Sequence, residues 1–345
     1  MQITPHVSLK AYNSFGFNVH AEYFCIVTSL AELQAAVSFA TSEKVPLLMI
    51  GGGSNLILVA DVPGLVIVNR IQHKAVQRLA EGEYCVTAGA GENWHAFVRW
   101  TLANGYNGLE NLSLIPGTVG AAPMQNIGAY GVEIKDRMLS LEALDLQTGE
   151  ICRFTAQECG FAYRDSFFKS REPGRYLILS VSFRLLADVQ PVLDYSGLGD
   201  LLAGEGVAQP TAVQISDLIC RIRQSKLPAP EQIGNAGSFF KNPLITEQHC
   251  TELLQRFPGL VSFPDRAGFR KLAAGWMIDQ LGWKGRREGD AGVYDKQALV
   301  LVNHGAASGA QILALAGQIQ AAVVERYGVM LEIEPRIYPD GNLTP

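Results

Sequence analysis

Apolar and polar residues along the first part of the chain alternate between the spacing of helices and that of strands. Ser29 and Glu32 form a capping box, which predicts a helix that runs to about Lys44. Short apolar runs predict buried strands at residues 46–50, 56–59 and 65–68. Together these elements indicate a β-rich α/β unit.

A similar pattern returns from Tyr84 onward. A strand at 84–88 precedes an amphipathic helix from Glu92 to Asn104, which Gly105 ends. A loop rich in Gly, Pro and Asn occupies residues 107–131. Further strands are predicted after this loop, at 138–146, 149–154 and 176–185.

The last part of the chain contains a predicted boundary and a smaller α/β region. Pro228 and Pro230 interrupt a predicted helix, and a boundary is expected there. A second capping box, Ser308 with Gln311, predicts the last helix. A final strand is predicted at 329–337.

Length and composition limit the class of protein. A chain of 345 residues exceeds one typical core and indicates two or three domains. Hydrophobic residues make up 48% and charged residues 18%, which is typical of a packed globular protein. The net charge of −5 and the isoelectric point of about 5.7 do not fit a nucleic-acid-binding surface. We therefore expect no nucleic-acid partner.

The cysteine, histidine and apolar residues argue against a disulfide-bonded, metal-binding, secreted or membrane-spanning protein. The six cysteines form no Cys-x-x-Cys pair and the six histidines are dispersed, so we expect reduced thiols and no metal site. The N-terminus lacks the pattern of a signal peptide. No apolar run reaches the roughly 18 residues needed to cross a bilayer. These features predict a cytoplasmic protein that does not insert into membranes.

Two glycine-dense loops, at 51–55 and 115–131, carry the first candidate site. Consecutive backbone N–H groups in such loops form anion-binding nests, which suit a pyrophosphate, although either loop alone could be a tight turn. A Rossmann fingerprint is excluded, because Trp94 stands where a third glycine must follow Gly89 and Gly91. The candidate cofactor contacts are Gly51, Gly52, Gly53, Ser54, Asn55, Pro116, Gly117, Thr118, Gly120, Ala121, Gln125, Asn126, Gly128 and Ala129.

Three polar side chains stand out elsewhere. Arg164 lies between aromatic residues and could bind a substrate carboxylate, or serve as a structural partner of Asp165 or another acid. Glu334 shares a predicted strand face with Glu332, and such an acid is normally a surface residue. Ser238 lies in a turn without the Gly-x-Ser-x-Gly pattern of hydrolases, and a serine of this kind is usually a hydrogen-bonding turn residue.

A local concentration of cations surrounds Ser238. Arg221, Arg223, Lys226 and Lys241 fall within 21 residues of an otherwise acidic chain. Such a cluster suits the phosphates of a ligand such as a nucleotide sugar.

Several segments resemble the family of UDP-N-acetylenolpyruvoylglucosamine reductases. They occur in the family's order and extend from about Asn13 to Ile337. In this sequence they read Gly-Gly-Gly-Ser-Asn from residue 51, Pro-Gly-Thr-Val-Gly-Ala-Ala-Pro from 116, Tyr-Arg-Asp-Ser from 163, Gly-Asn-Ala-Gly-Ser-Phe-Phe-Lys-Asn-Pro from 234 and Leu-x-x-Glu-x-Arg from 331.

The resemblance implies an α+β fold. It would comprise the FAD-binding fold of the vanillyl-alcohol oxidase type, with two α/β subdomains, and a smaller α/β substrate-binding domain. The FAD-binding region overall is expected at about 16–187. The expected boundaries are 1–70 for the first subdomain, completed by 330–345, then 71–228 for the second and 229–329 for the substrate-binding domain.

The resemblance also implies a reaction. Members of the family reduce enolpyruvyl-UDP-GlcNAc, which is UDP-N-acetyl-3-O-(1-carboxyvinyl)-glucosamine, to UDP-N-acetylmuramate, with NADPH as hydride donor and FAD as carrier. The product serves peptidoglycan precursor synthesis, and through it cell-wall biogenesis, cell shape and cell division. By the same resemblance we expect a monomer that binds FAD non-covalently.

Carried onto this chain, the resemblance assigns roles to single residues. Ser238 would be the proton donor, and Arg164 and a protonated Glu334 would stabilise the substrate carboxylate. Pro335 follows Glu334 where the family commonly has valine, and proline removes one N–H from the predicted strand. The residues expected to contact the substrate are Tyr130, Tyr163, Tyr195, Arg223, Lys226, Asn242 and Gln297.

Two other functions remain open from the sequence. An oxidase of a sugar or alcohol on the same flavin fold would often attach its flavin through a His or Cys in the glycine loops, and neither loop contains one. A catalytically silent nucleotide-sugar sensor would not need Arg164, Ser238 and Glu334, which are all present.

Overall fold

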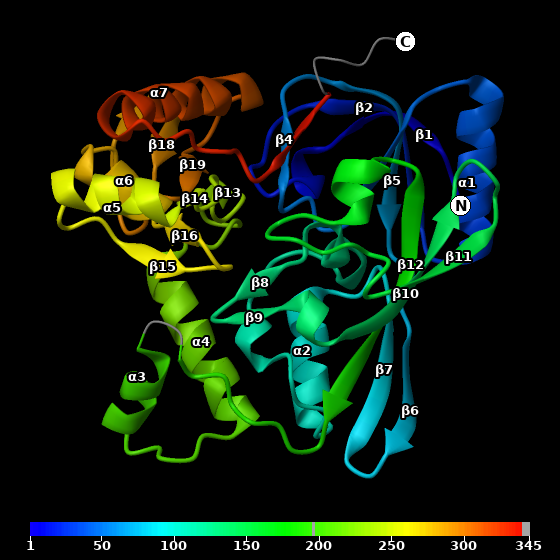
Figure 1. Ribbon diagram of the computed structural model, residues 1–345. Coiled ribbons are helices and arrows are strands. Elements are labelled where there is room, and N and C mark those ends of the chain that lie inside the picture. Colours follow the sequence, from blue (N-terminus) through cyan, green and yellow to red (C-terminus); the bar gives the residue numbers. More distant parts are fainter. Residues whose placement is uncertain (195–196, 340–345) are drawn as a thin grey trace. The chain divides into compact units, whose positions relative to one another are not determined.

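The computed structural model describes residues 1–194 and 197–339 of the chain, which form two compact units (Figure 1). The first unit consists of residues 1–7, 21–52 and 63–223. The second consists of residues 8–20, 53–62 and the chain from Gln224 onward. Each unit is therefore built from segments that lie far apart in the sequence. The domain boundaries expected at 70/71 and 228/229 stay predictions.

A four-stranded sheet and one helix form the first part of the first unit. The strand order is β1-β2-β5-β3, and β3 and β5 pair in parallel. Helix α1 (Leu30–Glu43) begins as the capping box predicts, because the Ser29 hydroxyl accepts the Glu32 N–H, and it ends at a left-handed Lys44. The strands are β1 (Thr4–Ser8), β2 (His20–Val27), β3 (Leu47–Ile50) and β5 (Val62–Asn69).

A five-stranded antiparallel sheet forms the second part of this unit, in the order β11-β10-β12-β7-β6. Helix α2 (Trp94–Ala103) packs on it, and the rings of Trp94, Phe97 and Phe183 form a fully buried cluster. The strands are β6 (Lys74–Ala80), β7 (Glu83–Gly89), β10 (Met138–Asp145), β11 (Ile151–Thr155) and β12 (Tyr176–Leu186).

The long glycine-rich loop between α2 and β10 is made of short turns. A small hairpin, β8 (Gly128–Ala129) with β9 (Val132–Glu133), follows three 3-10 turns in this loop. Two helices, α3 and α4, close the unit and pack through Leu198, Leu202, Ile215 and Ile219. The turns and helices are Glu110–Leu112, Val119–Ala121, Pro123–Gln125, Ile134–Asp136, the π-helix Phe167–Arg171, α3 (Leu198–Gly204) and α4 (Ala212–Lys226).

The second unit contains two small antiparallel sheets and a parallel strand pair. The sheet orders are β13-β19-β18-β17 and β14-β16-β15, and β4 pairs with β20. Its strands are β4 (Leu56–Leu58), β13 (Gly234–Asn235), β14 (Leu244–Thr246), β15 (Ser262–Pro264), β16 (Phe269–Leu272), β17 (Arg287–Glu288), β18 (Ala291–Val293), β19 (Leu301–Asn303) and β20 (Arg336–Tyr338). Its helical elements are a 3-10 turn at Lys10–Tyr12, α5 (Glu247–Arg256), α6 (Ala274–Gln280) and α7 (Gly309–Tyr327).

Two sequence predictions for the second unit have different outcomes. The capping box at the start of α7 is confirmed, since the side chains of Ser308 and Gln311 each accept the backbone N–H of the other. The final strand predicted at 329–337 is wrong in extent, because β20 begins only at Arg336. Pro335 has no N–H to give to a ladder, and the stretch before it forms only an isolated bridge, between Ile333 and Phe240.

A buried ion pair in the five-stranded sheet predicts how stability depends on pH. Arg175 donates to the buried carboxylate of Asp145 at 2.8 Å and lowers its pKa. A depressed pKa means that the stabilisation is present above the unfolded value, about 3.9, and is lost as the pH falls through the folded value. Asp145→Asn should therefore unfold at lower urea concentration than wild type at pH 7.

The difference between Asp145→Asn and wild type should shrink as the pH falls below about 3.9 toward the lower folded pKa of Asp145, because the unfolded wild-type chain then takes up a proton that the folded chain does not. Glu150→Gln, which changes an exposed acid in the same hairpin, is the matched control and should leave the midpoint nearly unchanged. A difference that stays constant with pH would contradict this account of the ion pair.

Candidate active site

The two glycine-dense loops touch each other through Gly51 and Gly52 of the first loop, which belong to the first unit. A Cβ added to Gly52 would lie 2.8 Å from the Gly117 Cα, and one added to Gly51 would collide with the Thr118 side chain. Real Cβ atoms do not approach backbone atoms this closely, so Gly52 excludes any side chain, and at Gly51 the Thr118 hydroxyl would have to move. The glycines that the sequence suggested as cofactor contacts therefore serve a close approach of two backbones.

The first loop also offers backbone donors. The N–H groups of Gly52, Gly53 and Ser54 donate to no acceptor in the described part of the chain. Gly53 has a left-handed φ of 60°, which turns successive N–H groups toward one side. Such a nest fits the pyrophosphate of a dinucleotide. The backbone donors of this loop are therefore suited to bind the cofactor.

The first turn of α2 holds the second loop in place. The Trp94 N–H donates to the Gly117 carbonyl at 3.1 Å, and the Val119 N–H donates to the Glu92 carbonyl at 2.9 Å. Gly120 follows, and a Cβ at this position would collide with Ala90. The loop is thus fixed to the helix at both ends of its Gly117–Gly120 stretch.

Arg164 lies against the end of the same loop. Its Nη2 donates to the Gly128 carbonyl at 2.8 Å, and its guanidinium carbon lies 5.2 Å from the centre of the Tyr163 ring. Arg164 and Tyr130 both have left-handed backbones, with φ of 54° and 50°. Such conformations cost about 1–3 kcal/mol each in residues other than glycine and cluster at functional sites. The structure therefore brings Arg164, Tyr163, Tyr130 and Gly128 together.

Side-chain bonds attach the segment around Arg164 to this loop. Asn126, which is buried and left-handed, donates to the Ala162 carbonyl at 3.0 Å. Ser166 donates to the Met124 carbonyl at 2.7 Å. Lys169 donates to the amide oxygen of Gln125 at 3.2 Å. Asn126 and Gln125, predicted as cofactor contacts, thus have structural partners in the protein.

Arg223 on α4 interacts electrostatically with Tyr130 and Arg164 of this cluster. Its Nε is buried and has no hydrogen-bond partner among the described residues. Burial lowers the pKa of Arg223, while Tyr130 and Cys220 oppose this shift and Arg164 adds to it. A buried guanidinium with an unpaired donor is costly unless an anion binds to it. This fits its predicted contact with a substrate diphosphate.

Sequence reasoning missed Asn111, which connects two of these segments. Its buried side-chain amide donates to the Tyr130 carbonyl at 2.8 Å and to the Val192 carbonyl at 2.9 Å. It therefore supports the left-handed turn at Tyr130. No local pattern marks an Asn for such a role, because its two acceptors lie 19 and 81 residues away in the chain.

In the second unit, Glu334 is paired with the residue next to Ser238. The Glu334 N–H donates to the Phe239 carbonyl at 2.9 Å, and Phe239 is fully buried. Ser238 itself is exposed and follows the left-handed Gly237. One step further along the same pairing, Glu332 forms an exposed ion pair with Lys241 at 2.9 Å. The structure thus separates the two acids into a half-buried one beside Ser238 and a solvated one.

Two further predicted substrate contacts of this unit, Asn242 and Gln297, form hydrogen bonds in or near the same segment. The Asn242 side-chain oxygen accepts the Ala274 N–H at 3.0 Å, at the start of α6. The Gln297 side-chain oxygen accepts the Leu299 N–H at 3.3 Å, and the Leu299 carbonyl accepts the Phe239 N–H at 2.7 Å. Lys226 is exposed at the end of α4, and Tyr195 lies outside the described residues.

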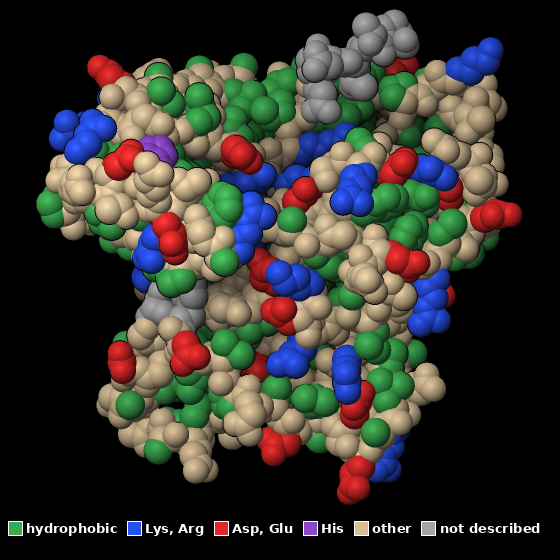
Figure 2. Space-filling view, in the orientation of Figure 1, with side chains coloured by type: hydrophobic (Ala, Val, Ile, Leu, Met, Phe, Trp, Pro, Cys, Tyr) green, Lys and Arg blue, Asp and Glu red, His purple; other side chains and the backbone are tan. Residues whose placement is uncertain are grey.

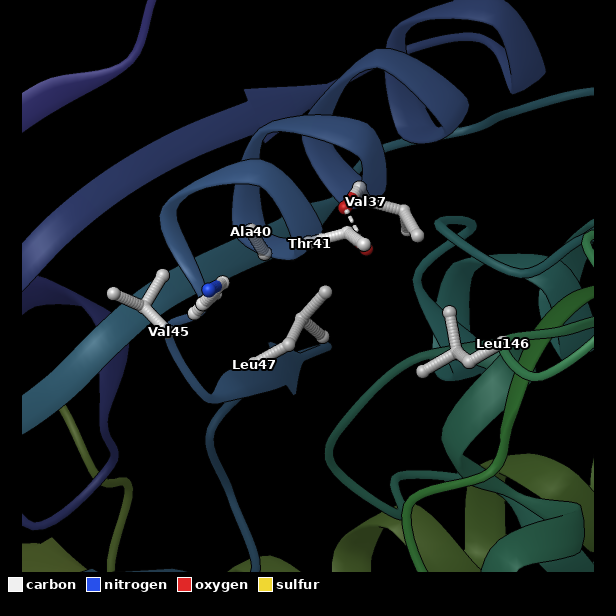
Figure 3. A pocket seen from close by; sticks show the side chains of 7 residues that line it. Val37, Ala40, Thr41, Val45, Leu47 and Leu146 are labelled. Atoms are coloured by element: carbon white, nitrogen blue, oxygen red, sulfur yellow. Dashed lines mark hydrogen bonds between the residues drawn. The ribbon is translucent and has the colours of Figure 1, made fainter. Parts of the chain in front are cut away.

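Other features of the described residues do not form a competing site. A pocket of about 220 Å³ lies beside the C-terminal end of α1 and contains none of the predicted site residues (Figure 3). Lys and Arg side chains are interspersed with Asp and Glu on the face shown in Figure 2. Across residues 1–194 and 197–339, no helix is long and apolar enough to cross a membrane, and no acid, His and Cys cluster could hold a metal.

Comparison with known families first gives the class of protein. Residues 21–155 match the model of the FAD binding domain, which covers both glycine loops. A solved 6-hydroxy-D-nicotine oxidase from Arthrobacter nicotinovorans shares the fold, with a TM-score of 0.52 and 12% identity over 95% of this chain and 86% of that one. The chain is an FAD-binding oxidoreductase, and the predicted α+β fold with an FAD-binding region is confirmed.

The particular family follows from the rest of the chain. Residues 229–338 match the model of the UDP-N-acetylenolpyruvoylglucosamine reductase C-terminal domain. Reductases of this name from Pseudomonas putida and Pseudomonas aeruginosa are 54% and 52% identical over 98% of this chain and 99% of theirs. The solved reductase from Thermus caldophilus has a TM-score of 0.69 and 25% identity, covering 98% of this chain and all of that one. The chain belongs to the UDP-N-acetylenolpyruvoylglucosamine reductase family.

The contact between the glycine loops yields a test on cofactor binding. Gly52→Ala places a methyl group against the Gly117 backbone and should weaken FAD binding by more than tenfold, measured by titrating apoprotein with FAD. Gly317→Ala is the matched control, because nothing lies within 4 Å of its added Cβ in the middle of α7. It should keep FAD and gain about 0.5–1 kcal/mol in stability. Unchanged FAD affinity in Gly52→Ala would contradict the proposal that the contact between the two glycine loops shapes the FAD site.

Proposed function

We propose that the protein reduces UDP-N-acetylenolpyruvoylglucosamine to UDP-N-acetylmuramate with NADPH as the hydride donor, as a cytoplasmic monomer in peptidoglycan precursor synthesis. The names of its relatives, at up to 54% identity, support the substrate and the reduction. The FAD binding domain match supports a flavin-mediated route. NADPH as donor and the place in peptidoglycan synthesis rest on the resemblance of the sequence to its family.

The backbone pairing of Glu334 with Phe239 is the observation that carries the proposed catalytic roles. It ties the backbone of Glu334, a half-buried residue, to the residue that follows the exposed Ser238, although Glu334 and Ser238 lie 96 positions apart. The neighbouring acid, Glu332, is neutralised by Lys241 in solvent. We therefore assign Glu334, and not Glu332, to the substrate.

The chemistry requires a proton donor and stabilisation of negative charge. Bound FAD supplies the hydride that adds to the methylene carbon of the enolpyruvyl group. Negative charge then develops at the adjacent carbon and spreads into the substrate carboxylate, where fixed charges and hydrogen-bond donors stabilise it. In our proposal Arg164 and a protonated Glu334 bind this carboxylate, and the Ser238 hydroxyl donates its proton to the carbon.

The structure supports a preorganised Arg164. The Gly128 carbonyl and the Tyr163 ring hold its guanidinium, so little side-chain freedom remains to be lost on binding. A serine hydroxyl is a weak acid, and we propose that Lys226 and Lys241 assist it. The remaining proposed substrate contacts are Tyr130, Tyr163, Tyr195, Asn242 and Gln297, with Arg223 on the diphosphate.

Removing the proposed donor should separate the two halves of the reaction. Ser238→Ala should still oxidise NADPH at nearly the wild-type rate, because that step needs no proton from Ser238. Reduction of the enolpyruvyl substrate should slow by about 10²- to 10⁴-fold or more. Stopped-flow absorbance of the flavin follows both halves separately. An intact second half-reaction would exclude Ser238 as the donor.

The two neighbouring acids provide a matched pair of variants. Glu334→Ala should lower kcat for substrate reduction by at least tenfold, since it removes a group proposed to stabilise the transition state. Glu332→Ala removes only an exposed ion pair, which is worth about 0–1 kcal/mol, and should change kcat little. Steady-state kinetics of both variants decide the assignment, and equal losses would contradict it.

A further inference from the structure

The turn before the second glycine loop is held by three consecutive side-chain hydrogen bonds. The Trp94 indole donates to the Leu112 carbonyl at 2.8 Å, and the Leu114 N–H donates to the Nδ1 of His95 at 3.0 Å. Between them, the buried Ser113 hydroxyl shares a hydrogen bond of 2.7 Å with Ser216 of α4. Two helices thus fix the backbone where it enters the Gly117–Gly120 stretch.

Leu114 is the strained residue of this turn. Its φ is 58°, in the left-handed region that a branched side chain disfavours by about 1–2 kcal/mol. Three residues later, Gly117 lies against Gly52 with no room for a side chain. A return of Leu114 to a right-handed or extended backbone would redirect the chain at that contact. The hydrogen bond to His95 is the side-chain interaction that holds the Leu114 N–H.

We propose that His95 is a positioning residue for the flavin, whose neutral imidazole, unprotonated at Nδ1, holds Leu114 left-handed so that the glycine loops keep the shape that binds FAD. His95 acts through Leu114 and needs no contact with the cofactor. The inference rests on the FAD-binding class of the chain and is independent of the proposed substrate and hydride donor.

The surroundings of His95 favour the required protonation state. Because Nδ1 accepts the Leu114 N–H, the proton of a neutral ring lies on Nε2, which faces the Cys220 sulfur at 3.9 Å. Burial lowers the pKa of His95, and so do the charges of Arg99 on its own helix and Arg223 on α4. Arg99 is itself paired with Asp217 at 2.6 Å. An imidazolium would place a second donor against the Leu114 N–H.

Two substitutions of His95 separate its hydrogen bond from its bulk. His95→Ala leaves the Leu114 N–H without an acceptor and should weaken FAD binding by about tenfold, measured by flavin fluorescence as apoprotein is titrated. His95→Asn keeps an acceptor oxygen near the position of Nδ1 and should bind FAD within about threefold of wild type. Equal losses in both variants, or no loss in His95→Ala, would overturn the proposal.

A second-site change tests the route through Leu114. Glycine adopts a φ of 58° without strain, so Leu114→Gly introduced into His95→Ala should recover most of the lost FAD affinity. If His95 merely supported the fold, the added glycine would weaken the protein further and FAD affinity would not recover, which would overturn the proposal. Thermal unfolding of the apoproteins, followed in parallel, distinguishes lost affinity from lost folding.

The protonation state has its own spectroscopic signature. In ¹⁵N-labelled protein, His95 should give the pattern of a neutral ring protonated at Nε2, and this pattern should persist below pH 6.5, the ordinary pKa of histidine. A signal from a charged ring or from the Nδ1-protonated tautomer at neutral pH would contradict the assignment. These measurements involve neither NADPH nor the sugar substrate. A result that contradicts the role of His95 would therefore say nothing against the proposed substrate and hydride donor, which the stopped-flow experiments test.

Discussion

A close approach of two backbones in the first unit shapes the proposed cofactor site. Gly51 and Gly52, just after β3, lie directly against Thr118 and Gly117, and the Gly117 backbone leaves no room for a Cβ at Gly52. This contact brings together a loop that ends a parallel strand and a loop fixed to the N-terminus of α2. The rest of the cofactor cradle depends on it, because both loops present their small residues only while their backbones meet.

Left-handed residues other than glycine mark the parts of the structure that this arrangement strains. Leu114, Asn126, Tyr130 and Arg164 all have φ between 46° and 58°. Each such residue costs about 1–3 kcal/mol, and in this chain each has a hydrogen bond that offsets part of that cost. His95 accepts from Leu114, Asn111 donates to the Tyr130 carbonyl, and the Asn126 and Arg164 side chains donate to backbone carbonyls. Four of the six left-handed residues other than glycine in the described part of the chain thus lie in or beside the segments where substrate and cofactor contacts are proposed, and the other two are His6 and Lys44.

Local signals in the sequence were reliable where a single turn decides the structure. The capping boxes at Ser29 and Ser308 predicted the starts of α1 and α7, because each involves side chains only three residues apart. The last strand could not be delimited, since its ladder partner lies in β4, about 280 residues earlier, and Pro335 prevents a longer pairing. Pattern alone could not reveal that Asn235, in β13, donates to the Ser14 carbonyl.

The candidate site likewise has features that the sequence reveals and contacts that only the folded structure reveals. The glycine loops and the cationic cluster were visible in the sequence, and resemblance to a family selected Arg164, Ser238 and Glu334 among ordinary polar residues. The supporting contacts of Asn111 and His95 were not predictable, because each depends on a carbonyl or N–H that tertiary folding delivers.

One spectral titration tests the central claim, that a flavin bound to this chain links NADPH to an enolpyruvyl sugar. Purified holoprotein should be yellow, should bleach under anaerobic NADPH and should regain its colour when UDP-N-acetylenolpyruvoylglucosamine is added. UDP-N-acetylglucosamine, which lacks the enolpyruvyl group, should not restore the colour. A protein that stays bleached with the enolpyruvyl substrate, or recovers equally with both sugars, would contradict the account.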